Sequence, residues 1–327
     1  MGIVQVDPSI DREGVASEGQ DLPTVCVLCS HNCSLRVDVT EGALARVRPD
    51  ANSQLTHGYA CNKAASIGRY VRHAQRVTRP LRRRPEGGFE EVSWETAISE
   101  IGAKLKHIQQ QHGGRAIGLV GVGGQGNHMD AGYALGFLQG LGSRRWFSAY
   151  AQEKTQNHLV DGWLMQASPS AILHGDTAKA RYLLVLGTNP RISNRGHRPN
   201  DTFRALSRDP ERRLVVVDPR QTETTRLADL HLRVRPGQDV YLLLALCASV
   251  VQQGLVDTAF LSKRTRDADI VTRLLADLSV DQLAARAGVR ADCLGQEAAR
   301  FASADGAAVM WDLGIEQGRF STLNAYL

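Results

Sequence analysis

The sequence CVLCSHNC at residues 26–33, followed by Cys61, decides how the first part of this chain folds. Three thiols within eight residues can converge only if the backbone wraps around one centre, and the fourth thiol must return from a separate loop. One thiolate for each iron is the ligand set of a cuboidal 4Fe-4S cluster. The spacing C-x2-C-x3-C-x27-C therefore predicts such a cluster, with Cys26, Cys29, Cys33 and Cys61 as its ligands.

Two other arrangements of these thiols are weaker interpretations. Structural zinc sites usually join two C-x2-C pairs, whereas the second half of this motif has a single cysteine. Disulfides are less favoured still, because bridges within one short loop would close very small rings. His31 lies between two of the thiols and could be a ligand, but with four cysteines at hand we favour a place for it behind the ligands or in solvent.

The residues around the motif predict a small β-rich domain over residues 23–80. Residues 34–39 alternate apolar and polar side chains, Glu41 and Gly42 indicate a turn, and residues 43–47 resume the extended pattern of a β-hairpin. A hairpin of this size does not fold alone, so the cluster would supply the missing core. Lys63 follows the last thiol and could place its ammonium against the cluster, although a solvated lysine is the simpler interpretation.

The composition is that of an ordinary folded chain, with 43% hydrophobic and 22% charged residues. No apolar run approaches the roughly eighteen residues of a membrane helix. Residues 1–22 are polar and carry no basic segment followed by an apolar one, so we expect a disordered lead-in and no export signal. Thiols that must stay reduced to bind metal then indicate a cytoplasmic protein.

Residues 69–84 carry seven arginines. This basic run could be a solvated connector, a counter-charge for an anionic cofactor, or a nucleic-acid site. Binding of single-stranded nucleic acid usually adds aromatic platforms to a basic groove, and Tyr70 is the only Phe, Trp or Tyr in this run. Because the net charge of +5 is also modest, we expect no nucleic-acid partner.

From Phe89 onward, strand and helix patterns alternate. Residues 81–327 are therefore predicted to form an α/β domain with a doubly wound, Rossmann-like parallel sheet. Ser93 can cap a helix that ends at Gly113. Further helices are expected at residues 130–141 and 240–253, and strands at residues 116–120, 182–186, 214–217, 231–234 and 307–311. The loops at the carboxyl ends of such strands should form the ligand crevice.

Gly121, Gly123 and Gly126 satisfy G-x-G-x-x-G between a predicted strand and a predicted helix. The motif is the best argument for an NADP-dependent dehydrogenase, since Arg144 and Arg145 follow where an NAD enzyme would carry an acidic residue. We keep this dehydrogenase as the second interpretation. A non-catalytic iron-sulfur electron-transfer protein is the third.

Taken in order, the four-cysteine motif with Lys63 and the strand-end loops 187–190, 218–220 and 236–239 resemble the molybdopterin-dependent oxidoreductases, especially their formate dehydrogenase and periplasmic nitrate reductase branch. The resemblance extends from about Val25 to the last residue. It implies an oxidoreductase with a molybdenum or tungsten bis-molybdopterin guanine dinucleotide cofactor, acting on a small-molecule substrate by oxygen-atom or hydride transfer. It also implies a redox partner, which could be a ferredoxin, a flavoprotein or a quinone-linked subunit.

The resemblance also assigns roles to residues. The four motif cysteines would ligate the cluster, and Lys63 would lie between the cluster and a pterin on the electron path. Strand-to-helix turns present N–H groups to pyrophosphate, and carboxylates can accept hydrogen bonds from ribose or guanine. The residues expected to contact the cofactor are Gln125, Ser148, Gly187, Thr188, Asn189, Pro190, Ser193, Asp218, Pro219, Arg220, Thr222, Gly237, Gln238 and Asp239. Of these, Asn189 and Thr222 could equally be ordinary turn residues.

Two departures from the family pattern bear on activity. A cysteine or selenocysteine that binds the metal is expected near residues 151–153, where this sequence has none, and Cys247 and Cys293 lie in helical patterns typical of core thiols. Glu153 or Ser148 could supply an oxygen ligand instead, or oxo or water could fill the position. The chain is also about half the length typical of the family, so we expect an α/β domain that is truncated at its C-terminus.

Overall fold

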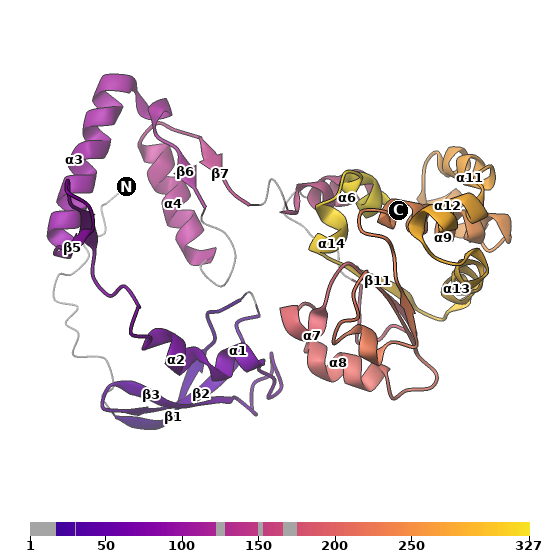
Figure 1. Cartoon of the computed structure of the whole chain (residues 1–327), viewed down its shortest axis with the longest axis horizontal. Coiled ribbons are helices and arrows are strands. Elements are labelled where there is room, and N and C mark those ends of the chain that lie inside the picture. The colour runs from indigo at the N-terminus through magenta and orange to yellow at the C-terminus, as the bar shows by residue number, and fades with distance from the viewer. Residues whose placement is uncertain (1–17, 30, 122–127, 150–152, 166–174) are drawn as a thin grey trace. The chain divides into compact units, whose positions relative to one another are not determined.

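The computed structural model of this chain describes residues 18–29, 31–121, 128–149, 153–165 and 175–327, except for the side chains of residues 128–131 (Figure 1). The chain divides into two compact units, residues 1–149 and 150–327. Within the described ranges, no helix combines the length and the hydrophobicity that a membrane crossing requires.

The first unit begins with an antiparallel sheet in the order β1-β2-β3. Strands β2 (Ser34–Thr40) and β3 (Ala43–Pro49) are the predicted hairpin. Strand β1 (Gly19–Val25) includes four residues that composition assigns to the lead-in. They are extended because β1 pairs with β2, with Leu22 opposite Val37, and this pairing has no local sequence signal.

The remaining elements of the first unit are short, apart from two helices. Helix α3 is capped as predicted, since the Ser93 hydroxyl oxygen accepts a 3.1 Å hydrogen bond from the Thr96 amide. The predicted strand at 116–120 is shorter than expected, because residues 114–116 form a 3-10 turn. The elements are α1 (Asn62–Ala65), α2 (Ile67–Val71), β4 (Leu81–Arg83), β5 (Phe89–Glu91), α3 (Trp94–His112), β6 (Leu119–Val120), α4 (His128–Gly140) and β7 (Trp146–Phe147).

The second unit, residues 150–327, is an α/β domain and lies within the region 81–327 for which that fold was predicted. Its strands are β8 (Tyr182–Leu186), β9 (Arg213–Val217), β10 (Leu230–Leu232) and β11 (Ala307–Trp311). Its helices are α6 (Thr155–Met165), α7 (Pro190–Ser193), α8 (Pro199–Leu206), α9 (Asp239–Gln252), α10 (Thr258–Arg264), α11 (Ala268–Ala276), α12 (Val280–Ala287), α13 (Ala291–Ser303), α14 (Leu313–Glu316) and α15 (Ser321–Tyr326).

The four strands of this unit form one parallel sheet in the order β10-β9-β8-β11. The chain therefore moves outward from β8 to β10 and then returns to the other side of β8 with β11. In sheets of this kind the place where the strand order reverses is where ligands bind, at the carboxyl ends of the strands. Here that switch point lies between β8 and β11.

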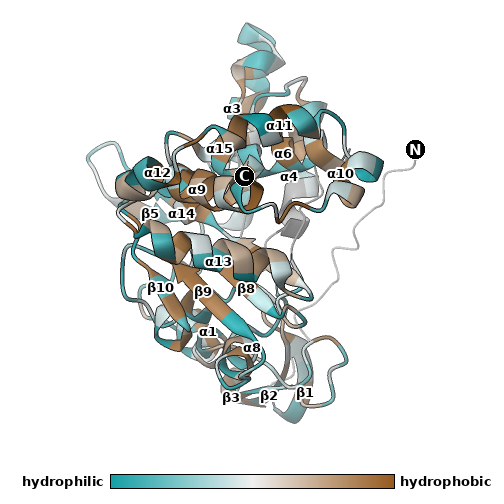
Figure 2. Ribbon diagram, turned by 90° about the vertical axis from the view of Figure 1, so that its right-hand side faces the viewer, coloured by the Kyte–Doolittle hydropathy of each residue, from teal (hydrophilic) through white to brown (hydrophobic). Residues whose placement is uncertain are grey.

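Both faces of the parallel sheet are covered. Leu183 and Leu214 belong to the core that includes Phe203 of α8, whereas Leu184 and Val215 belong to the core that includes Leu242 of α9. Alternate residues of each strand thus face opposite layers, and strands buried on both faces are almost wholly apolar. Figure 2 shows β8 and β9 mainly in the colour of hydrophobic residues. The sheet is doubly wound, as predicted.

Candidate functional site

The cysteine motif forms a closed loop in the first unit. The Cys26 amide donates a 2.8 Å hydrogen bond to the Cys33 carbonyl oxygen, and the Asn32 amide donates one of 3.2 Å to the Cys29 carbonyl oxygen. Asn32 has a φ of 43°, which tightens the turn between these thiols. Cys26 and Cys33 are buried, while Cys29 and Cys61 are partly exposed. Cys61 returns to the loop as the residue that precedes helix α1.

The four thiols are electrostatic neighbours. Burial, together with the charges of Cys29, Cys26 and Cys61, raises the pKa of Cys33 to about 11. Among the described residues, no three His, Cys, Asp or Glu side chains are grouped as a single metal ion would require. A cuboidal cluster binds one thiolate at each iron and spreads its ligands over a wider space than one ion does. The four thiols supply one thiolate for each iron of such a cluster.

Lys63 lies next to this site. It is half-buried within α1, and its positive charge acts on Cys26, whose pKa burial raises and Lys63 lowers. The buried core around Cys26 and Cys33 is small and includes Leu35, Tyr59 and Ile67. A bound cluster would complete this core, as metal does in other small metal-dependent domains.

In the second unit, Gly187 joins the ends of three strands. Its amide donates a 3.1 Å hydrogen bond to the Val217 carbonyl oxygen, and its own carbonyl oxygen accepts one of 2.9 Å from the Gly314 amide. Gly187 has a φ of +58°, and a Cβ there would lie 2.8 Å from Gly314 Cα. Glycine is therefore required for β8, β9 and the segment after β11 to meet at one edge of the sheet.

Asn189 ties the loop after β8 to the loop after β9. Its amide nitrogen donates a 2.7 Å hydrogen bond to Glu223 Oε2, and this bond holds the pKa of Glu223 below its usual range. Its amide oxygen accepts a 2.7 Å hydrogen bond from the Thr224 hydroxyl. Thr222 has a local role, because it exchanges hydrogen bonds with Thr225 within one turn. Sequence reasoning missed Glu223 and Thr224, although they directly follow a predicted cofactor loop.

The structure brings together the two predicted acidic residues of the crevice. The Asp218 carboxylate accepts a 2.8 Å hydrogen bond from the Arg220 amide, which orders the loop after β9. Asp239 is buried at the start of α9, and Gly237, with a φ of +74°, makes the turn before it. Burial raises the pKa of Asp239, and the charge of Asp218 raises it further. The two carboxyl groups therefore lie within electrostatic range of each other.

The other predicted contacts are more scattered. Thr188 and Pro190 are buried beside Gly187, whereas Ser193, Pro219 and Arg220 are exposed. Gln238 is half-buried before α9, Ser148 is half-buried in the first unit, and Glu153 is half-buried in the second. Gln125, residues 151–152 of the predicted metal-ligand segment, and both Gly123 and Gly126 lie outside the described residues.

A group of charged residues that sequence reasoning missed lies at the switch point. Lys154, just before α6, donates a 2.6 Å hydrogen bond to Asp312 Oδ1 and also pairs with Glu316. Arg195 Nε lies 2.8 Å from the other Asp312 oxygen. Asp312 directly follows a predicted strand, as Asp218 does, and could have been found by that signal. The pairing of Lys154 with Glu316 spans 162 residues and has no local signal.

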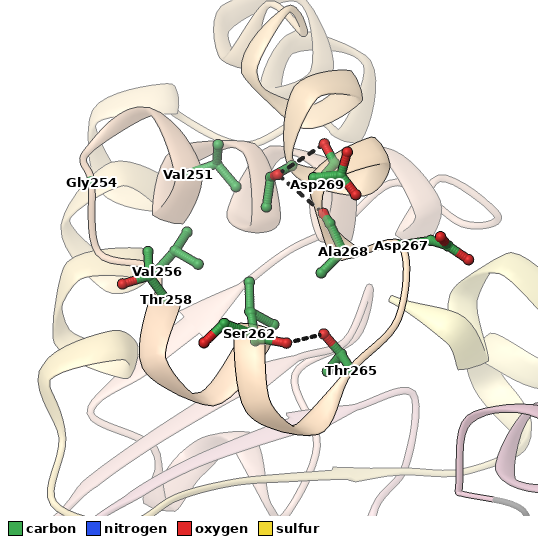
Figure 3. Close-up of a pocket in the computed structure, with 11 residues that line it drawn as sticks. Val251, Gly254, Val256, Thr258, Ser262, Thr265, Asp267, Ala268 and Asp269 are labelled. Carbon is green, nitrogen blue, oxygen red and sulfur yellow. Dashed lines mark hydrogen bonds between the residues drawn. The ribbon is translucent and has the colours of Figure 1, made fainter.

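A pocket of about 550 Å³ lies elsewhere, beside α10 and α11 (Figure 3). The Thr265 hydroxyl donates a hydrogen bond to the Leu261 carbonyl oxygen, and the Thr272 hydroxyl donates to the carbonyl oxygens of residues 268 and 269. These hydroxyl groups serve their own helices. We assign no ligand to this pocket.

Comparison with known proteins identifies the protein family in which these two sites occur. A family model described as the molybdopterin oxidoreductase Fe4S4 domain matches residues 20–73, and one described as molybdopterin oxidoreductase matches residues 76–314. The chain belongs to the molybdopterin oxidoreductase family. The match confirms the predicted family, its molybdopterin cofactor and its 4Fe-4S cluster. Because it extends across the glycine motif at 121–126, the NADP-dependent dehydrogenase interpretation gains no support.

Several curated molybdopterin oxidoreductases resemble the chain over most of its length. It is 25% identical over 319 residues to the assimilatory nitrate reductase catalytic subunit of Bacillus subtilis, covering 94% of this chain and 43% of the relative. It is 30% identical over 320 residues to the assimilatory nitrate reductase of Haloferax mediterranei, covering 94% and 42%. It is 25% identical over 311 residues to formate dehydrogenase H of Escherichia coli, covering 90% and 41%.

A solved structure supports the fold of this molybdopterin oxidoreductase chain. Acetylene hydratase from Pelobacter acetylenicus matches with a TM-score of 0.77 and 24% identity, covering 93% of this chain and 42% of that one. The chain thus spans about two fifths of the length of the proteins that it matches. The predicted combination of a small β-rich domain and a parallel-sheet domain is confirmed.

Proposed function

We propose that this chain binds a 4Fe-4S cluster through Cys26, Cys29, Cys33 and Cys61 and uses it to pass electrons to or from a molybdopterin guanine dinucleotide cofactor. The observation that carries the proposal is the mutual proximity of the four thiols, two of them buried, in a small core that a cluster would complete. Membership of a family does not by itself show that this chain keeps its four cysteine ligands close together.

The strand-end loops of the second unit are the proposed cofactor-binding elements. The loop that starts at Gly187 is held to the loop after β9 by Asn189, and the paired carboxyl groups of Asp218 and Asp239 lie at the same edge of the sheet. Carboxylates there suit the N–H groups of guanine or the hydroxyls of a ribose. When bound, the molybdenum or tungsten centre supplies the two-electron chemistry on a small-molecule substrate.

Lys63 is the proposed link between the cluster and the cofactor. Its ammonium already acts on the thiol of Cys26, so it can donate hydrogen bonds at the cluster and offset negative charge there. The segment 151–153, where a cysteine ligand to the metal was expected, contains no cysteine. We propose Glu153 or Ser148 as an oxygen ligand instead. The electron partner would be a ferredoxin, a flavoprotein or a quinone-linked subunit, and a cytoplasmic location fits reduced thiols.

Metal analysis of protein purified without oxygen tests this function. We expect iron and sulfide in cluster proportions, together with molybdenum or tungsten and a guanine nucleotide. Iron without either heavier metal or nucleotide would favour the second candidate, a non-catalytic iron-sulfur electron-transfer protein. An absence of iron after anaerobic reconstitution would reject both.

A further inference from the structure

Four charged side chains meet at the switch point of the parallel sheet, and together they form the switch-point cluster: Lys154, Arg195, Asp312 and Glu316. They come from three segments, which precede α6, follow α7 and follow β11. The Lys154 ammonium binds both carboxylates, and Arg195 binds Asp312. The backbone holds these segments at the edge of the sheet, because the Asp312 amide donates a 3.3 Å hydrogen bond to the Leu186 carbonyl oxygen at the end of β8.

The two carboxyl groups of this cluster have unequal surroundings. Within the described part of the chain, Asp312 has a cation at each oxygen, whereas Glu316 pairs with one cation, Lys154, which it shares with Asp312. The Glu316 side chain is fully buried, and its Oε1 atom has no hydrogen-bond partner among the residues that the structure describes. When two carboxylates share one ammonium, their pKa values move apart. The carboxylate with fewer positive charges and hydrogen-bond donors around it binds a proton first. Burial raises the pKa of Glu316, and the nearby charge of Asp312 adds to this, while Lys154 and Arg195 oppose it.

Glu297 shows what full compensation looks like in the same unit. It is as buried as Glu316, with 2% exposure each. Its carboxylate accepts two hydrogen bonds from Arg213 and one each from Tyr182 and Arg300. Burial opposes ionisation, but these partners outweigh it and the pKa of Glu297 lies below its usual range. The pKa values of two equally buried glutamates are thus shifted in opposite directions because of their partners.

We propose that Glu316 carries a proton near neutral pH and is the proton-holding residue of the crevice at the switch point. The proposal rests on the proposed function, since reducing an oxygen-bearing substrate with two electrons and release of water takes up two protons. In the step assigned here, Lys154 gives one proton to Asp312, and the Glu316 O–H bond breaks as its proton restores the ammonium. The Asp312 O–H bond then breaks as an O–H bond forms on the substrate oxygen that leaves as water. A proton from solvent then re-forms the Glu316 O–H bond, and no electron moves within the step. In the opposite direction the carboxylate accepts a proton.

The charged neighbours define how the proton can reach solvent. Lys154 and Asp312 each keep 12% of their side chains exposed, and Arg195 keeps 35%. Because an ammonium has no lone pair, Lys154 can carry a proton between Glu316 and the partly exposed Asp312 only by giving one of its own protons to one carboxylate before it takes one from the other. The Gln156 side-chain amide donates a 2.7 Å hydrogen bond to the Glu316 carbonyl oxygen and fixes the backbone there. Glu316 acts as a positioning residue for the proton, with no assigned contact to the substrate.

Infrared difference spectroscopy of the full chain tests the protonation directly, with or without cofactors. The wild-type chain should show the carbonyl stretch of a protonated carboxylic acid near neutral pH, and Glu316→Gln should remove it. The matched variant Glu297→Gln should leave that band unchanged. Asp312→Asn removes the neighbouring negative charge, so the band should titrate at lower pH. If Glu316→Gln leaves the band, or Glu297→Gln removes it, the proposal is overturned.

A measurement without substitutions guards against misfolding of the variants. In the wild-type chain labelled with ¹³C at glutamate carboxyl groups, one carboxyl signal should titrate well above the others. If all glutamates titrate in the ordinary range, Glu316 holds no proton.

In the loaded enzyme, Glu316→Gln should remove one limb of the pH profile of substrate reduction by a dye donor, and Glu316→Asp should shift that limb. An unchanged profile would also overturn the proposal.

The two hypotheses fail separately. If the wild-type chain shows the buried acid but takes up no iron, molybdenum or tungsten, the proposed function is wrong and the protonation of Glu316 stands. If the loaded enzyme reduces substrate but no buried acid is detected, the proposed function stands and the role of Glu316 is rejected.

Discussion

The amide of Cys26 donates a 2.8 Å hydrogen bond to the carbonyl oxygen of Cys33, so the first and third thiols of the motif lie on one closed turn of backbone. Replacing Cys33 with alanine should therefore abolish cluster binding, because three remaining thiolates leave one iron without its protein ligand. Iron content and visible absorbance after anaerobic reconstitution measure this. The matched variant is Cys293→Ala, which removes a partly buried thiol on α13. Equal iron in both variants would contradict the ligand assignment.

A second prediction concerns Lys63, whose charge acts on Cys26. Lys63→Ala should keep the iron content and make the cluster harder to reduce, because a positive charge near the cluster stabilises the added electron. A redox titration of the cluster measures the change. In the enzyme loaded with its cofactor, cluster reduction by substrate should also slow. Lys63→Arg keeps the charge and should stay close to wild type, whereas an unchanged potential in Lys63→Ala would remove Lys63 from the electron path.

The parallel sheet was predictable because its strands are buried on both faces. The expected segments 182–186 and 307–311 are strands β8 and β11 with the same bounds. Buried parallel strands form continuous apolar runs, and that signal is local. Strand β1 was missed because its order comes from pairing with β2, beyond the reach of its own sequence.

The candidate site was predictable where its residues follow a strand. Asp218 and Asp239 were found in this way, and the structure places them in electrostatic range. The switch-point cluster could not be found, because Lys154 meets Glu316 only after the sheet has brought together segments 162 residues apart. Long-range ion pairs leave no periodic pattern in a sequence, so only the fold reveals them.

Gly187 offers a test of the close approach at the switch point. Gly187→Ala should lower the free energy of unfolding by about 3 kcal/mol. One cause is the left-handed backbone at this position, and the other is that the added Cβ would clash with the backbone of residues 314–315. Urea denaturation measures it. Gly254→Ala is the control, since Gly254 has a φ of +68° with nothing within 4 Å of its Cβ position, and it should cost about 1 kcal/mol. Equal losses would show that the contact with residues 314–315 is unimportant.

Asn189 should control cofactor retention more than folding. Asn189→Asp is nearly isosteric, but it sets a carboxylate beside Glu223, where the amide now donates a 2.7 Å hydrogen bond. The loops after β8 and β9 should then separate, and guanine nucleotide released per iron should fall severalfold while the iron content stays constant. The conservative change Glu223→Gln removes the repulsion, so the double variant should recover part of the nucleotide. Nucleotide content at the wild-type level in Asn189→Asp would show that this link does not hold the cofactor.

Glu297 predicts the acid sensitivity of the second unit. Burial opposes its ionisation, but Arg213, Tyr182 and Arg300 hold its pKa below the usual range. A depressed folded-state pKa stabilises the fold above the unfolded-state pKa, and this contribution is lost as the pH falls through the folded-state value. Glu297→Gln should therefore lower the free energy of unfolding at pH 7 by about 2 kcal/mol, and the difference from wild type should shrink on acidification. Urea denaturation between pH 3 and 7 measures this.

The control is Glu211→Gln, which alters an exposed pair with Arg181 and should change the free energy of unfolding by less than about 0.5 kcal/mol. A gap between Glu297→Gln and wild type that stayed constant with pH would show that the Glu297 charge does not contribute.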